Sequence, residues 1–138
     1  MSFLLDTNVV SEIRKKTPNA GVSAWFTSVP EKELFLSVLV VGEISHGIER
    51  LARRDAVQAK ALEQWLKQLV DAYGDRIVPI TTEVAEIWGL LNVPDPAPVV
   101  DGLMAATALA HDWTLVTRNV TDVASTGVRL LDPFRAEG

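Results

Sequence analysis

Acidic side chains occur at three well-separated points of the sequence, each beside an apolar segment. Asp6 follows the run Phe3–Leu5, Glu43 lies among valines and isoleucines, and Asp101 follows a proline-rich stretch. Carboxylate oxygens are the ligands that hard divalent cations prefer, whereas zinc sites usually contain cysteine or histidine. If the fold gathers these carboxylates, their mutual repulsion raises their pKa values unless a cation supplies positive charge. The residue types therefore predict a Mg²⁺ site, with Mn²⁺ as the alternative.

A second group of polar residues follows the apolar segment Thr114–Val116. It contains Arg118, Asn119 and Asp122. Each acid of the chain, taken alone, has a simpler explanation as a helix cap, a solvated helix residue or a loop residue. In open α/β sheets, however, ligands bind at the carboxyl ends of the strands. We therefore expect the fold to bring this group and the three acids to one edge of a sheet.

The elements that position these residues follow from the apolar patterning. We expect strands at Phe3–Leu5, Leu34–Ser37, Ile77–Ile80, Thr114–Val116 and Val128–Leu131. Segments with apolar residues three and four apart lie between the strands and predict helices. This alternation predicts an α/β sandwich around a mainly parallel central sheet of four to five short strands. The pattern leaves the order of the strands open.

Local signals predict where some of the helices begin. Thr17 followed by Pro18 is typical of a helix N-terminus. The three prolines between residues 92 and 98 predict a loop, and the helix after it places Asp101 in its first turn. Glu43 should lie about one turn into a helix that packs on the sheet, close to the buried face of that helix. A carboxylate there is costly unless a cation or a hydrogen-bond donor compensates its charge.

The charge balance argues against binding of nucleic acid through a basic surface. The 138 residues carry a formal net charge of −5, and polyanion binders are usually basic. A carboxylate cluster that holds cations escapes this objection, because the cations meet the phosphate. The lack of cysteine excludes disulfides, zinc–thiolate sites and cysteine nucleophiles. Without a basic leader or an apolar run of about 20 residues, we expect one domain over residues 1–138, located in the cytoplasm.

Four segments of the sequence carry a family resemblance. In chain order they read LLDTNVVSE, VGEISHGI, VVDGLMAATALAH and TLVTRNVTD. Together they resemble the PIN-domain family, most closely its VapC-like toxins and their FitB-like branch. The resemblance spans nearly the whole chain, with the motifs in the family's order. It implies a PIN-like fold and a metal-dependent endoribonuclease that acts as the toxin of a type II toxin–antitoxin pair.

The resemblance also implies which acids perform the chemistry. The family's first metal-binding aspartate matches Asp6, its glutamate matches Glu43, and its third acid matches Asp101. One or two Mg²⁺ ions would be held by Asp6, Asp101 and, directly or through water, Glu43. Such a site hydrolyses phosphodiester bonds without a histidine pair and without the 2′-hydroxyl as nucleophile.

Further positions of the family's motifs carry over less directly. Asn8 belongs to the first motif, and the family's polar residue after the penultimate strand falls within Thr117, Arg118 and Asn119, so we expect these four to position the substrate. Many relatives have an acid where this chain has Asn119. Asp122, as a fourth catalytic acid, or an additional water should therefore complete the site.

The resemblance implies three partners: an RNA substrate, a small VapB-like antitoxin and a second copy of the chain, in a homodimer or a larger assembly with the antitoxin. The antitoxin would lie across the groove and place a basic side chain among the carboxylates. Basic residues that could contact RNA, or that could simply form a solvated helix surface, are Arg14, Lys15, Lys16, Arg53, Arg54 and Arg118.

Two other functions are compatible with parts of the sequence. An aspartyl phosphotransferase of the haloacid-dehalogenase type also places an aspartate after its first strand. That chemistry needs a second carboxylate where this chain has Asn8 and a hydroxyl where it has Val10. The alternative to an enzyme is a non-catalytic PIN-like module that binds nucleic acid in complex with its partner. A degraded acidic cluster would favour this module, but Asp6, Glu43 and Asp101 are all present.

Overall fold

A computed structural model describes residues 1–135, and its strands form one parallel sheet. The strands are β1 (Phe3–Leu5), β2 (Leu34–Ser37), β3 (Ile77–Val78), β4 (Thr114–Val116) and β5 (Leu130–Leu131). Their order is β3-β2-β1-β4-β5, and every neighbouring pair is parallel. The predicted α/β fold with a mainly parallel sheet is confirmed, and β1 lies at its centre.

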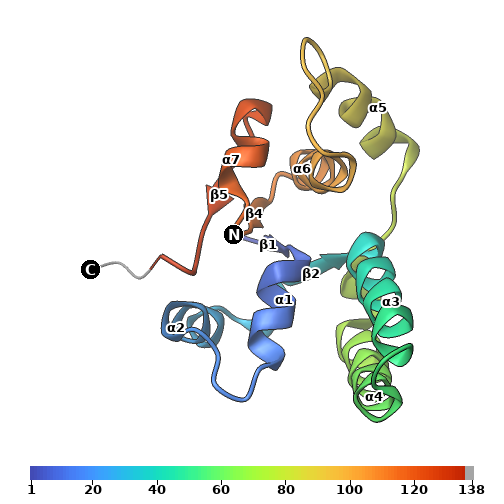
Figure 1. The fold of residues 1–138 in the computed structure, drawn as a ribbon. Helices are drawn as coiled ribbons and strands as arrows, with labels where there is room; N and C mark the ends of the chain where they lie inside the picture. Colours follow the sequence, from blue (N-terminus) through green and yellow to red (C-terminus); the bar gives the residue numbers. More distant parts are fainter. Residues whose placement is uncertain (136–138) are drawn as a thin grey trace.

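Helices cover both faces of this sheet. Those with α-helical geometry are α1 (Thr7–Arg14), α2 (Ala20–Ser28), α3 (Val38–Ala52), α4 (Ala56–Tyr73), α5 (Thr82–Leu91), α6 (Val99–His111) and the short α7 (Val120–Val123). The first four lie on one side of the sheet and α5, α6 and α7 on the other (Figure 1). Within residues 1–135, no helix combines the length and the apolar character that crossing a bilayer requires.

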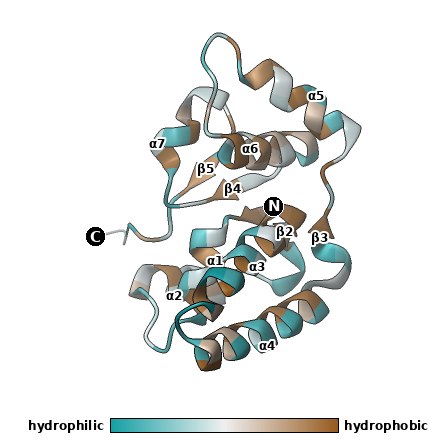
Figure 2. Ribbon diagram, turned by 45° about the vertical axis from the view of Figure 1, so that its right-hand side comes forward, coloured by the Kyte–Doolittle hydropathy of each residue, from teal (hydrophilic) through white to brown (hydrophobic). Residues whose placement is uncertain are grey.

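The core lies between the central strands and the helices on either side. Leu4 and Leu5 of β1 and Leu115 and Val116 of β4 are all buried, and Met104 of α6 packs into the same core. Parallel strands covered on both faces have apolar residues at successive positions, as these do. Figure 2 shows the same distinction among the helices: α6 is hydrophobic over most of its length, whereas hydrophilic and hydrophobic residues alternate along the more exposed α4.

Two strands are shorter than predicted. β3 ends before Pro79, which has no N–H to donate to a neighbouring strand. β5 begins later than predicted because a turn precedes it. In this turn Gly127 has a φ of 79°, and the Val128 N–H donates to Thr126 Oγ1 at 3.3 Å.

The predicted helix start at Thr17–Pro18 is wrong, and Glu12 explains why. α2 begins at Ala20, with Asn19 as its N-cap. The carboxylate of Glu12 is buried and accepts the Asn19 N–H at 2.8 Å, while Lys15 Nζ lies 2.8 Å from its other oxygen. The hydrogen bond from Lys15 and then that from Asn19 hold the pKa of Glu12 below its usual value. A contact with α1, beyond the reach of local capping rules, therefore fixes where α2 begins.

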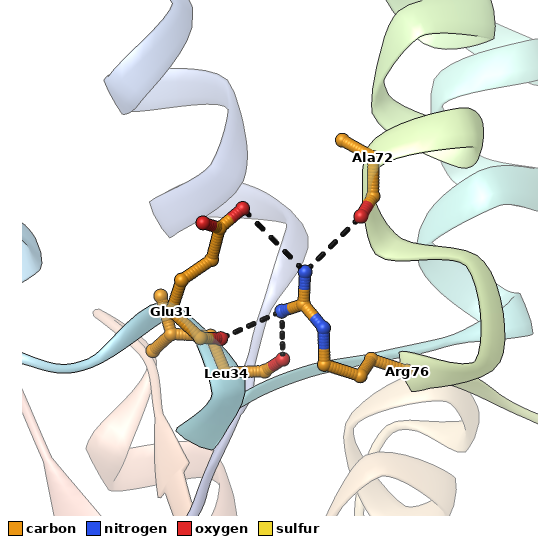
Figure 3. Close-up of polar contacts among 4 residues, drawn as sticks. All are labelled: Glu31, Leu34, Ala72 and Arg76. Carbon is orange, nitrogen blue, oxygen red and sulfur yellow. Dashed lines mark hydrogen bonds and ion pairs between the residues drawn. The ribbon is translucent and has the colours of Figure 1, made fainter.

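Arg76 joins the end of α4 to the start of β2 (Figure 3). Its Nη1 donates to the carbonyl oxygens of Glu31 and Leu34, both at 2.7 Å, and its Nη2 donates to the carbonyl oxygen of Ala72 at 3.1 Å. The guanidinium carbon also lies 4.5 Å from the ring centroid of Tyr73. A single side chain from the connection into β3 thus satisfies one backbone carbonyl at the end of α4 and two at the approach to β2.

Replacing this guanidinium by an ammonium should destabilise the fold. We expect Arg76→Lys to lower the free energy of unfolding by about 1–3 kcal/mol, because a lysine cannot match the planar fork that reaches these carbonyls. Urea denaturation followed by circular dichroism measures the change. Arg53→Lys, at an exposed position at the end of α3, is the control and should leave the midpoint unchanged. Equal midpoints for the two variants would contradict the assigned role.

Candidate active site at the carboxyl edge of the sheet

Asp6 lies at the carboxyl end of the central strand and is held in one orientation. Its side chain is only 5% exposed. One oxygen accepts the Thr7 N–H at 2.7 Å and so caps α1; the other accepts the Thr117 hydroxyl at 2.6 Å and the Asn8 amide at 3.3 Å. The capping role and the site role of Asp6 therefore coexist, one on each oxygen. The donors come from the start of α1, which follows β1, and from Thr117, which follows β4, so the position of this carboxylate depends on the pairing of those strands.

Asn8 and Thr117 connect the ends of β1 and β4. The Asn8 carbonyl oxygen accepts the backbone N–H of Arg118 at 3.2 Å, and its amide donates to Thr117 Oγ1 at 3.4 Å. Thr117 is almost fully buried, and its hydroxyl also accepts the Asn119 N–H at 2.9 Å. The hydrogen bonds of both side chains thus hold Asp6 and the loop after β4 in place.

Glu43 lies on α3 beside the start of α1. Its carboxylate accepts the hydroxyl of Thr7 at 2.5 Å. The expectation that Glu43 lies close to the buried face of its helix is wrong: Glu43 is exposed, and Ile44 and Ile48 occupy the buried stripe of α3. Glu43 therefore needs no cation to offset burial. Thr7, for which no sequence signal predicted a role in the site, fixes its orientation.

Asp101 lies in the first turn of α6 and is partly buried. Burial is the largest cause that raises the pKa of its carboxyl, followed by the negative charges of Asp6, Asp122 and Glu43; the side chain of Asn119 acts in the opposite direction. The charges of Asp6 at the end of β1, of Asp122 on α7 and of Glu43 on α3 therefore all act on Asp101 at this edge. The structure brings together the carboxylates that the sequence separates widely.

The remaining predicted residues lie around this cluster with different orientations. Asp122 is exposed on α7, and Asn119 precedes that helix as its N-cap residue. The guanidinium carbon of Arg118 lies 4.2 Å from the ring centroid of Phe134. Arg118 thus stacks on an aromatic ring at the rim, and along residues 1–135 it forms no ion pair with the acids of the cluster.

The side chains of this cluster are suited to a hard cation, and they are spaced too widely to enclose one ion together. All the clustered side chains offer oxygen, and the charges that raise the pKa of Asp101 would be balanced by a cation. In the described part of the chain, no three acidic or histidine side chains are close enough to surround one ion together. Mg²⁺ commonly retains several waters and binds through only one or two carboxylates, so an open cluster fits it better than a cation that needs a closed cage.

Comparison with known proteins identifies the family. The sequence model of the PIN domain matches residues 3–121. Toxin FitB of Neisseria gonorrhoeae is 30% identical over an alignment that covers 96% of this chain and 98% of FitB. VapC ribonuclease Y4jK of Sinorhizobium fredii is 27% identical over 96% of this chain and 97% of its own length.

Solved structures share the fold described above. The crystal structure of FitAcB from Neisseria gonorrhoeae matches with a TM-score of 0.89 at 29% identity, covering 96% of this chain and 99% of the other. A toxin–antitoxin complex from Klebsiella pneumoniae matches with a TM-score of 0.73 at 22% identity, covering 96% and 98%; this second similarity is one of fold alone. With its sheet order, its edge of carboxylates and a sequence match over most of its length, the chain belongs to the PIN-domain family.

Proposed function

We propose that this protein is a metal-dependent endoribonuclease that acts as the toxin of a toxin–antitoxin pair. The observation that carries the proposal is the convergence of Asp6, Glu43, Asp101 and Asp122, seen in the charges that raise the pKa of Asp101. Further support comes from the relatives, because one is named a toxin and another a ribonuclease. PIN-domain ribonucleases generally depend on divalent metal ions.

The proposed metal is Mg²⁺, with Mn²⁺ as the alternative, held by Asp6 and Asp101 and, directly or through water, by Glu43. A divalent cation there supplies the positive charge that lowers the pKa of the attacking water and stabilises the leaving oxygen. Asp6 is the best prepared ligand, because two hydrogen bonds of 2.7 Å or less fix both of its oxygens. Asp101 contributes a carboxylate whose charged form the fold disfavours until a cation is near.

Other residues serve these acids in the proposed mechanism. Thr117 and Asn8 hold Asp6, and Thr7 holds Glu43. Asp122 adds negative charge at the fourth position, where the neighbouring Asn119 is neutral. Arg118 is exposed at the rim, and we assign it a contact with the RNA backbone outside the acidic cluster.

The proposed partners are RNA, a small VapB-like antitoxin and a second copy of the chain. The proposal of an antitoxin draws support from the relative named Toxin FitB, which is 30% identical over 96% of this chain. An antitoxin that places a basic side chain among these carboxylates would replace the cation and so block the site. We propose that residues 1–138 act as one domain and that the protein works in the cytoplasm.

Metal removal tests this function directly. The purified chain, free of any partner, should cleave a mixed pool of RNAs in Mg²⁺ or Mn²⁺, should stop in EDTA, and should resume when the metal is restored. The activity should coincide with the protein across a size-exclusion profile. Cleavage that continues in EDTA would contradict metal dependence. RNA binding without cleavage in any metal, by a folded protein, would instead favour a non-catalytic binding module.

A further inference from the structure

A pocket of about 230 Å³ opens beside Glu43, between α1, α3 and α4. α1 contributes Thr7, Ser11 and Arg14 to its lining, α3 contributes Glu43, and α4 contributes Trp65. Thr7 and Glu43 are also members of the acidic site, where they are joined by a hydrogen bond. The pocket is therefore continuous with the candidate active site and extends from it toward α4.

On the far side of this pocket, the guanidinium of Arg14 lies over the indole ring of Trp65. The guanidinium carbon of Arg14 lies 5.7 Å from the ring centroid of Trp65, within the range of a cation–π contact. Trp65 is half-buried against the core, whereas Arg14 is exposed. Arg14 makes no ion pair with any acid in the described part of the chain. Its charge and its N–H groups are thus available to a ligand, next to a region that is otherwise strongly acidic.

The size and chemistry of the pocket indicate which kind of group it can bind. Pockets for drug-sized ligands measure about 300–1,000 Å³, so this one suits a single flat group. Unpaired RNA bases stack on aromatic rings and on guanidinium planes, and their edges form hydrogen bonds with nearby polar groups. Ser11 offers an exposed hydroxyl for such an edge. The single cation also complements the phosphate that accompanies every base.

We propose that this pocket binds an unpaired nucleobase of the RNA, next to the scissile phosphate, stacked on the Arg14–Trp65 pair. The inference rests on the proposed ribonuclease function and adds a specificity site to it. Because a base in a duplex cannot enter the pocket, cleavage requires a single-stranded nucleotide beside the cut. Arg14 and Trp65 contribute to the choice of RNA, while the carboxylates perform the hydrolysis.

The test compares intact RNA with RNA that lacks one base. Cleavage sites are first mapped with the wild-type protein. Short single-stranded substrates around one site are then made with either the normal nucleotide or an abasic ribose at each flanking position. On intact RNA, Arg14→Gln and Trp65→Leu should each raise KM roughly tenfold with little change in kcat. On RNA that is abasic at the flanking position read by the pocket, the same substitutions should change KM by less than about twofold.

Matched variants separate this role from folding and from general charge. Trp65→Phe retains an aromatic face and should recover most of the affinity lost in Trp65→Leu, with thermal melts confirming that both fold. Lys67→Gln removes one positive charge from an exposed position of α4 outside the pocket and should leave KM unchanged on both substrates.

Two results would overturn the inference while leaving the ribonuclease function intact. One is an unchanged KM for Arg14→Gln on intact RNA. The other is an equal penalty on intact RNA and on both abasic RNAs, which would assign Arg14 to a backbone contact or the pocket to a protein partner. A wild-type protein that cleaves no RNA would remove the proposed function and this inference with it.

Discussion

Asp6→Asn protein is expected to cleave RNA about 1,000-fold more slowly than the wild type, or to lose detectable activity. The substitution removes the charge of the carboxylate that the fold positions most firmly. Asparagine is as good a helix cap as aspartate, and its carbonyl oxygen can still accept the Thr7 N–H. Its amide nitrogen replaces the oxygen that accepts the Thr117 hydroxyl and the Asn8 amide, so a thermal melt checks that the variant folds. Single-turnover cleavage of a mapped RNA, with Mg²⁺ in excess, measures the loss.

Two controls bracket this result. Asp71→Asn removes the same charge from an exposed position on α4 and should retain full activity. Thr117→Ser keeps the hydroxyl that donates to Asp6 and should remain within about tenfold of the wild type, at or below the cost of losing such a supporting hydrogen bond. Activity of Asp6→Asn within tenfold of the wild type would place the centre elsewhere.

Asp101→Asn is expected to lose activity to a similar degree and, in the absence of metal, to melt at a higher temperature than the wild type at pH 7. The helix dipole favours a charge in the first turn of α6, but burial and the three neighbouring acids outweigh it, because the pKa of Asp101 is raised. Removing the charge therefore removes an unfavourable contribution to the free energy of folding. Thermal melts in EDTA measure this gain.

The same pKa shift fixes how the gain depends on pH. A carboxyl whose pKa is raised on folding destabilises the protein once it is ionised. This cost begins as the pH rises past the pKa in the unfolded chain, about 3.9, and it is complete above the pKa in the folded protein. The difference in melting temperature between Asp101→Asn and wild type should be largest at pH 7 and should close toward pH 4. Mg²⁺ should raise the melting temperature of the wild type more than that of the variant. A variant less stable than the wild type at every pH would contradict the assigned repulsion.

Much of the fold was predictable because its signals are local. β1, β2 and β4 begin and end where the apolar runs do, since buried parallel strands need apolar residues at successive positions. The meeting of Asp6 and Asp101 was predictable for a related reason. Asp6 ends one parallel strand, and the helix that leads into the next parallel strand begins, near Asp101, at the same carboxyl edge. The metal-binding roles of these acids remain predictions.

Features that depend on distant contacts could not be predicted. The start of α2 is set by Glu12, and no capping rule considers a carboxylate from the preceding helix. The exposure of Glu43 was predicted wrongly because α3 has apolar residues on more than one side. Packing therefore decides how this helix is rotated against the sheet. Arg118 stacks on Phe134, a partner beyond β5 that no local motif names. The order of the strands is likewise a property of the assembled sheet.

The central place of β1 has a consequence for protein synthesis. The first strand that the ribosome makes, β1, pairs with β4. Asp6 accepts a hydrogen bond from the Thr117 hydroxyl, which lies 111 residues later in the chain. Domains fold only once the segments that complete them have emerged during translation. A nascent chain that has exposed Asp6 and Glu43, but still holds β4 within the exit tunnel, thus has at most three of the five strands and lacks the Thr117 hydroxyl that orients Asp6. The acidic site of this protein is consequently complete only when most of the chain has been made.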